Sequence, residues 1–209
     1  MKFLILLLIS MLVQACMPTH QREEPCGYRQ NVYGERISWK GNSPVKIFLH
    51  SSVPEEMIPA IKAAAESWNV AAGRQVIQIV ESPRYGGVNN YNRDMVNVIY
   101  YKTDWPESKM IIQGETRLSW VGDAMNETDI AINGSHYGFY WKFNEITRPA
   151  TPGIWSMVNI EALMLHELGH VLGLDHSAAS TSVMNSRLSS GSNRVVLDSI
   201  STQSLKCEY

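Results

Sequence analysis

An apolar stretch with three histidines, between residues 158 and 176, constrains the fold of this chain more than any other feature. Its aliphatic side chains lie on most sides of a helical projection, which predicts a buried α-helix. His166 and His170 are four residues apart, so both side chains lie on one face of that helix. Gly173 allows the helix to end in a left-handed turn, after which the chain can return and present His176 to the same place.

These side chains have the chemistry of a catalytic zinc site. Imidazole is a common zinc ligand, and three protein ligands leave a fourth position open, which distinguishes catalytic sites from structural ones. Glu167 follows the first histidine, so it can act as a general base without binding the metal itself. The alternative is a helix with ordinary surface histidines, which the apolar flanks disfavour. We predict that one zinc ion is bound by His166, His170 and His176.

The segment 166–176 reads H-E-x-x-H-x-x-G-x-x-H and resembles the signature of the metzincin zinc proteases. Metzincins also have a methionine turn downstream, and residues 182–185, Ser-Val-Met-Asn, lie at a fitting distance. The resemblance implies that Met184 forms an apolar floor below the metal. The alternative is ordinary core filling, since the chain has ten methionines.

Within the metzincins, the chain is most similar to the matrixins, including their small bacterial members. Ser177 follows the third histidine as it does in matrixins, whereas Ser186 stands where astacins and serralysins have tyrosine. The resemblance covers residues 37–206. It implies an α+β, zincin-like fold with a twisted, mostly parallel five-stranded sheet, an antiparallel edge strand, an active-site helix and a C-terminal helix.

The resemblance also implies a function, that of a zinc-dependent endopeptidase acting on extended protein or peptide substrates. Glu167 would be the general base. The edge strand at 114–120 would pair with the substrate backbone, and residues 186–188 would line the pocket for the residue after the cut. The alternative is a catalytically silent zinc-binding module on the cell surface, but such a module has no need to retain Glu167.

A second metal site of the kind found in animal matrixins is not expected. That structural zinc is built largely from histidines, and only His20, His50 and His136 remain, each isolated in the sequence. We therefore expect one zinc ion. A calcium requirement stays open, because no motif in the sequence decides it.

Length and composition fit one globular domain. The chain has 209 residues, of which 44% are hydrophobic and 18% are charged. Its net charge of −2, with no run of basic residues, argues against nucleic acid as a partner. We assume a monomer, since nothing in the sequence indicates an oligomer.

The first fifteen residues have the pattern of a secretory signal peptide. A positive start precedes an apolar run at 3–13 that is too short to span a bilayer. The run ends in Leu-Val-Gln-Ala-Cys, which resembles a bacterial lipobox and implies lipidation of Cys16 and attachment to a membrane. The alternative is plain cleavage after Ala15. Either way the mature chain crosses the inner membrane, as a cell-envelope lipoprotein or as a periplasmic or extracellular protein.

We divide the chain into a signal peptide at 1–15, a tether at 16–30 and a matrixin-like catalytic domain at 31–209. The tether contains Cys26, and the domain ends near Cys207. In an oxidising compartment these two cysteines can form a disulfide that joins the two ends. The alternative is that Pro-Cys-Gly around Cys26 acts as a matrixin cysteine switch, although the flanking Arg and Asp of that motif are missing.

The remaining elements follow from hydrophobic periodicity and from turn residues. Between the helices and strands, residues 82–94 and 134–153 are predicted to be loops, the second of them packing its own aromatic side chains. The predicted strands are 45–49, 76–80, 96–101, 114–121 and 128–133, and the predicted helices are 56–72, the histidine helix and one near 197–203.

Overall fold

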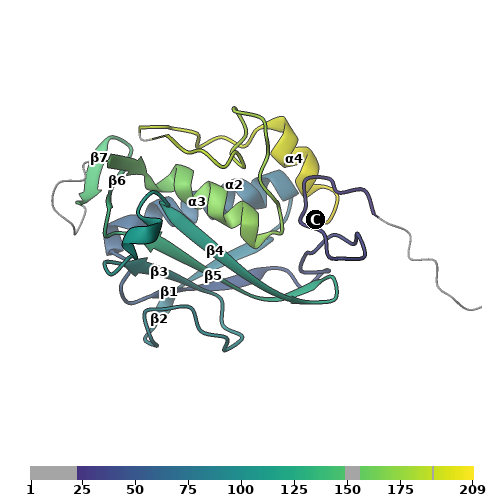
Figure 1. Cartoon of the computed structure of the whole chain (residues 1–209), viewed down its shortest axis with the longest axis horizontal. Helices are drawn as coiled ribbons and strands as arrows, with labels where there is room; N and C mark the ends of the chain where they lie inside the picture. Colours follow the sequence, from purple (N-terminus) through teal and green to yellow (C-terminus); the bar gives the residue numbers. More distant parts are fainter. Residues whose placement is uncertain (1–22, 149–155, 190) are drawn as a thin grey trace, which may run out of the picture.

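The computed structural model of this chain describes residues 23–148, 156–189 and 191–209. At its centre is a five-stranded sheet with the strand order β2-β1-β3-β5-β4 (Figure 1). Four strands run parallel, and β4 at one edge is antiparallel to its neighbour β5. The strands are β1 (Val45–His50), β2 (Ile77–Tyr85), β3 (Val98–Lys102), β4 (Gly114–Val121) and β5 (Ala124–Asn133).

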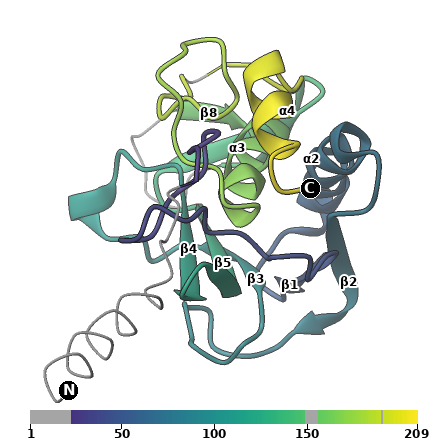
Figure 2. The same ribbon diagram turned by 90° about the vertical axis from the view of Figure 1, so that its right-hand side faces the viewer.

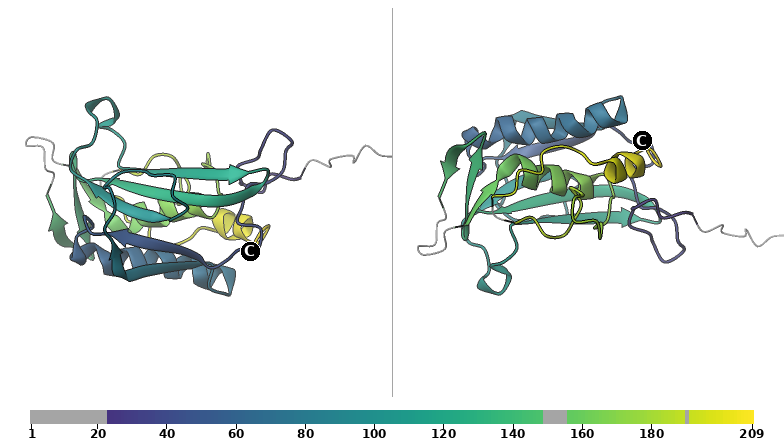
Figure 3. Two further views of the ribbon diagram at one scale, coloured as in Figure 1. Left: turned by 90° about the horizontal axis from the view of Figure 1, so that it is seen from below. Right: turned by 90° about the horizontal axis from the view of Figure 1, so that it is seen from above.

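Three helices cover one face of this sheet, as the two views of Figure 3 show. They are α2 (Ile58–Ala72), α3 (Ile160–Val171) and α4 (Ser199–Leu205). The short helix α4 lies beside α2, with the C-terminus between them (Figure 2). Two 3₁₀ turns, η1 (Glu55–Met57) and η2 (Glu107–Lys109), complete the helical elements of the described ranges. The α+β fold predicted from the sequence, with its mostly parallel sheet and antiparallel edge strand, is confirmed.

The core lies between the sheet and the pair α2 and α3. Strand β1 alternates, with Val45, Ile47 and Leu49 buried against the helices. From α2, the fully buried Trp68 donates its indole N–H to the Leu165 carbonyl of α3 over 3.0 Å. This bond satisfies the polar atom of a large apolar side chain and fixes the histidine helix against its neighbour.

The prediction of a loop over 134–153 is wrong for its first half. Residues 137–141 form β6 and residues 144–147 form β7, which pair antiparallel, and β8 (Ser156–Asn159) pairs parallel to β6. The β6–β7 turn consists of Lys142 and Phe143, at φ of 48° and 68°. Turns of this kind usually contain Asn-Gly or Asp-Gly, because residues with a bulky side chain rarely adopt positive φ. The Lys-Phe pair found here therefore gives no hairpin signal in the sequence.

Two strands are also longer than predicted. Strand β2 continues to Tyr85, although Pro83 and its surroundings predict a loop from residue 82. A proline is tolerated there because β2 lies at the edge of the sheet, where a missing N–H leaves no partner unsatisfied. Strand β5 begins at Ala124 rather than at 128, directly after a tight turn that contains Gly122 at φ +65°.

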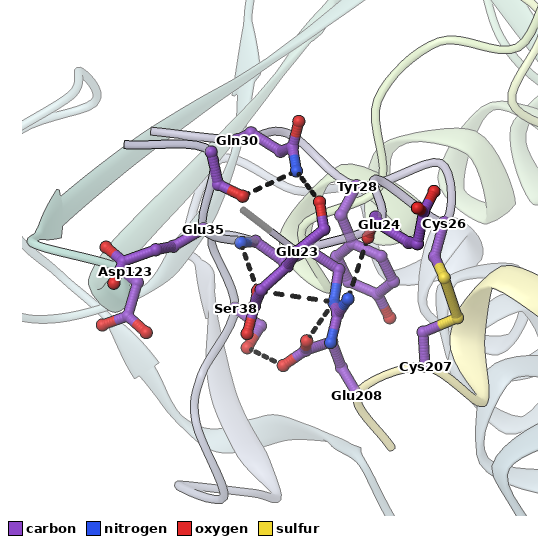
Figure 4. A network of polar contacts seen from close by, with 12 residues as sticks. Glu23, Glu24, Cys26, Tyr28, Gln30, Glu35, Ser38, Asp123, Cys207 and Glu208 are labelled. Carbon is purple, nitrogen blue, oxygen red and sulfur yellow. Dashed lines mark hydrogen bonds and ion pairs between the residues drawn. A yellow bond between two sulfur atoms is a disulfide. The ribbon is translucent and has the colours of Figure 1, made fainter. Parts of the chain in front are cut away.

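Residues 23–30, which the sequence assigns to the tether, pack on the domain. Tyr28 is 3% exposed and forms an isolated bridge with Leu174, just after α3. The predicted disulfide between Cys26 and Cys207 is present (Figure 4). A thiol that is bonded to Cys207 cannot ligate a metal, so the cysteine-switch interpretation is wrong for this structure.

Polar side chains join the N-terminal segment to the C-terminal end beside this disulfide (Figure 4). Arg36 forms ion pairs with Glu208 and with Glu23. Ser38 donates its hydroxyl to the second carboxylate oxygen of Glu208 over 2.6 Å, and Lys40 lies 3.5 Å from the same oxygen. The two ends of the domain are therefore held together by a covalent bond and by a charged cluster.

The predicted signal peptide and Cys16 lie outside the described residues. Among the helices of the described ranges, none combines the length and the hydropathy that crossing a bilayer requires.

Candidate metal centre and cleft

The three predicted metal ligands lie together at the end of α3. One ring nitrogen from each of His166, His170 and His176 lies within 4.8 Å of the other two. Gly173 permits this arrangement, because it has φ +100° and a Cβ there would collide with the Ile37 carbonyl. The chain thus turns sharply after the helix and brings the third histidine back, as the spacing predicts.

Hydrogen bonds fix the orientation of the first two rings. His166 Nδ1 donates to the Val183 carbonyl over 2.7 Å, and His170 Nδ1 donates to the Leu174 carbonyl over 2.8 Å. A carbonyl only accepts, so Nδ1 carries the proton in each neutral ring and Nε2 presents a lone pair.

The Nε2 atoms of the three rings converge. Nε2 of His170 lies 3.2 Å from Nε2 of His166 and 3.1 Å from Nε2 of His176. Electron pairs at that separation repel, and a cation placed between them removes the repulsion. The donor set therefore fits a zinc ion, with backbone carbonyls as the outer partners that orient the two rings.

Burial keeps the cluster in its metal-binding form. It lowers the pKa of His166, and it lowers the pKa of His170 to about 3 with a further contribution from the neighbouring imidazoles. The pKa of His176 is also lowered, by burial and by the charge of His166. Neutral imidazole is the form that binds metal, so no proton has to leave at neutral pH.

Glu167 lies beside the cluster and faces strand β4. Its side chain is 4% exposed, and Oε2 accepts a 2.6 Å hydrogen bond from the Thr116 hydroxyl. Burial raises the pKa of Glu167 to about 7, against the opposing effect of this hydrogen bond. A Cβ at Gly114 would lie only 2.9 Å from Oε1 of Glu167, so the absence of a side chain at Gly114 makes room for this second carboxylate oxygen. The sequence did not identify either β4 residue as a partner of Glu167.

Met184 lies directly below the histidine helix. It is 2% exposed, and its carbonyl accepts the Ser177 N–H over 2.8 Å. Gly169 faces it from α3, where a Cβ would overlap the methionine sulfur. Met184 thus packs against the histidine helix, and its role as the floor below the metal stays a prediction. This close contact could have been predicted, because a glycine inside a helical pattern, such as Gly169, often marks a place where another group packs closely against the helix.

Asp198, the N-cap of α4, connects this helix to the methionine turn. Its Oδ1 accepts the Ser201 N–H over 2.9 Å, and its Oδ2 accepts the Val183 N–H over 2.8 Å. Burial opposes the charged form, but these hydrogen bonds outweigh it and lower the pKa of Asp198. Through Val183, this carboxylate supports the residue whose carbonyl orients His166.

A cleft of about 560 Å³ opens in front of the histidines. One wall is the start of the edge strand β4, and the other is the chain after Met184, including Ser186 and Leu188. Both walls were predicted to contact substrate. Within the described residues, the other histidines, His50 and His136, belong to no such group of potential ligands.

The comparison of sequences agrees with this geometry. A sequence profile of the matrixin family matches residues 39–205, most of the chain. The chain belongs to the matrixin family. Curated protein sequences, by contrast, include no match. Matrixins are zinc metalloproteases, and in this matrixin a histidine triad is positioned to bind a metal.

Proposed function

We propose that this matrixin is a zinc-dependent endopeptidase that cuts extended polypeptides. The observation that supports this most strongly is the convergence of three Nε2 atoms next to a buried glutamate, at the base of an open cleft. A structural zinc site needs four protein ligands and no base, whereas this site has three ligands and Glu167.

His166, His170 and His176 would hold the metal. When bound there, zinc acts as a Lewis acid that polarises a carbonyl and makes a nearby water more acidic. Glu167 takes a proton from the attacking water and later delivers it to the leaving amine. Thr116 positions the carboxylate through its 2.6 Å hydrogen bond during both transfers.

The edge of β4 would hold the substrate. One side of β4 pairs with β5, and in the described residues no strand pairs with its other side, which lines the cleft. An extended peptide can add there as a further strand through main-chain hydrogen bonds. The segment 186–188 would then form the pocket for the residue after the cut.

The test is proteolysis by the mature chain loaded with zinc, on casein and on a peptide library. Cleavage is expected, with loss on chelation, recovery on adding zinc, and a fall of at least about a thousand-fold in kcat for Glu167→Gln. Lys62→Gln, on the exposed side of α2, is the control for the change of one side chain. Full activity of Glu167→Gln would refute the mechanism. Zinc binding without any cleavage would favour the silent binding module.

We also propose that Cys16 is lipidated, which would hold the domain at a membrane outside the cytoplasm. The lipobox-like sequence before this cysteine supports the proposal. In a bacterial host the full chain should enter the detergent phase on Triton X-114 partition, and Cys16→Ser should enter the aqueous phase. Intact-mass measurement of the product would reveal the added acyl chains, and their absence would favour plain secretion.

A further inference from the structure

Arg29 belongs to the segment before the matrixin match and lies at one end of the cleft. Its backbone is fixed from both sides, because its N–H donates to the Gly173 carbonyl over 3.0 Å and its carbonyl accepts the Ile37 N–H over 2.8 Å. The disulfide at Cys26 anchors the chain three residues earlier. Arg29 is exposed, so a ligand in the cleft can reach its side chain without any rearrangement of the helices or strands.

The Arg29 side chain lines two adjoining cavities. One is the cleft of about 560 Å³ with the histidines, and the other, of about 540 Å³, continues along β4. Thr116 and Leu118 line both cavities as well, so the two form one groove. His170 and His176 line the first cavity together with Arg29, so the guanidinium shares the cleft with the predicted metal ligands.

The direction of β4 shows which part of a substrate Arg29 would meet. Gln113 donates to the Leu188 carbonyl over 2.8 Å, so the start of β4 lies beside the pocket for the residue after the cut. From there the strand passes Thr116, the partner of Glu167, and reaches Leu118 next to Arg29. Residues before the scissile bond would therefore lie at the Arg29 end.

Arg29 has no ion-pair partner among the residues that the structure describes, and the acidic groups nearby are already engaged. Glu115 pairs with Lys109 at 2.9 Å and with Arg117 at 3.5 Å. The buried Glu127 and Asp129 line the second cavity and accept the backbone N–H groups of Asp94 and Val98. The guanidinium is thus available for a ligand.

We infer that Arg29 determines specificity, by binding an acidic side chain that lies on the N-terminal side of the scissile bond. A guanidinium can hold a carboxylate through two parallel hydrogen bonds, which lysine cannot do. The substrate's own C-terminal carboxylate is a less suitable ligand, because it would lie at the other end of the cleft, near Leu188. The inference rests on the proposed endopeptidase function.

The test compares peptides that carry Glu, Gln or Lys at each of the three positions before one cleavage site. For the unmodified chain, kcat/KM should be about two- to five-fold higher for Glu than for Gln at one position, as expected for a partly solvated charge pair. Arg29→Gln should bring this ratio to about one, and Arg29→Glu should give a preference for Lys. Lys62→Gln, which removes the same charge from an exposed side of α2, should keep the original ratio.

Binding gives a second measurement that does not need turnover. In the Glu167→Gln background, fluorescence anisotropy should show tighter binding of the Glu peptide than of the Lys peptide, and Arg29→Gln should remove the difference. An unchanged Glu-to-Lys ratio in Arg29→Gln, or no preference in the unmodified chain, would overturn the inference. A binding preference that depends on Arg29, in a chain that cleaves nothing, would support the inference and refute the endopeptidase function.

Discussion

Glu167 owes its position to two residues of the edge strand. Thr116 holds one carboxylate oxygen, and Gly114 leaves room for the other. Both belong to β4, which would also pair with the substrate. In the proposed function, the same strand would therefore hold both Glu167 and the substrate backbone, which would fix the distance between them.

Thr116→Val removes the hydroxyl at nearly constant volume. We expect kcat to fall about ten-fold with little change in KM, because the hydrogen bond positions the base and does not contact the substrate. Thr116→Ser keeps the hydroxyl and should restore most of the rate. A rise in KM with kcat unchanged would instead mean that Thr116 binds the substrate.

The elements with strong periodicity were predictable from the sequence. Helix α3 and the parallel strands have apolar patterns that are typical of buried elements. The spacing of the histidines predicts that His166, His170 and His176 lie together. The β6–β7 hairpin was not predictable, since its turn uses Lys142 and Phe143 at positive φ. Arg29 was not predictable either, because the bridge between Tyr28 and Leu174 brings it to the cleft, and such a long-range contact leaves no local pattern.

Asp198 links two elements, because it caps α4 and accepts a hydrogen bond from the methionine turn. Asp198→Ala should lower the free energy of unfolding by about 1–2 kcal/mol, through loss of the cap and of the bond to Val183. Asp198→Asn keeps one acceptor oxygen, so it can still accept one of the two N–H groups and should lose less. Urea denaturation of the three proteins measures the differences, and equal stability of Asp198→Ala and the unmodified chain would contradict this role.

For the molecule as a whole, the joined ends matter most. The disulfide between Cys26 and Cys207 spans 181 residues of sequence, so it restricts nearly the entire unfolded chain. The charged cluster around Glu208 lies beside it. Together they hold the N-terminal segment against the rest of the domain.

Replacing both cysteines by serine should lower the free energy of unfolding by about 5 kcal/mol in the chain-entropy treatment of so large a loop. Urea denaturation of this variant, and of the unmodified chain with and without a reductant, measures the change. The reductant should destabilise the unmodified chain alone. A variant as stable as the oxidised protein would show that the bond adds nothing to the polar contacts.

Glu208 gives the pH dependence of this junction. Burial opposes its charge, but hydrogen bonds from Ser38 and Arg36 outweigh that effect and lower its pKa in the folded state. A lowered pKa stabilises the fold above the unfolded value of about 4.3, and this stabilisation disappears as the pH falls through the folded value. Glu208→Gln should therefore cost about 1–2 kcal/mol at pH 7 and progressively less below about pH 4. A cost that stays constant from pH 3 to pH 7 would exclude the ionised carboxylate as its source.

The covalent closure at Cys26 also determines how the protein responds to force. Tension applied between the chain before residue 26 and the C-terminal Tyr209 passes from one sulfur to the other and on to the last two residues. The sheet, the histidines and the cleft lie outside that path, within the closed loop. The described domain, stretched between residue 25 and Tyr209, would therefore extend very little while the bond is intact, and the histidine cluster and its cleft would stay folded under tension.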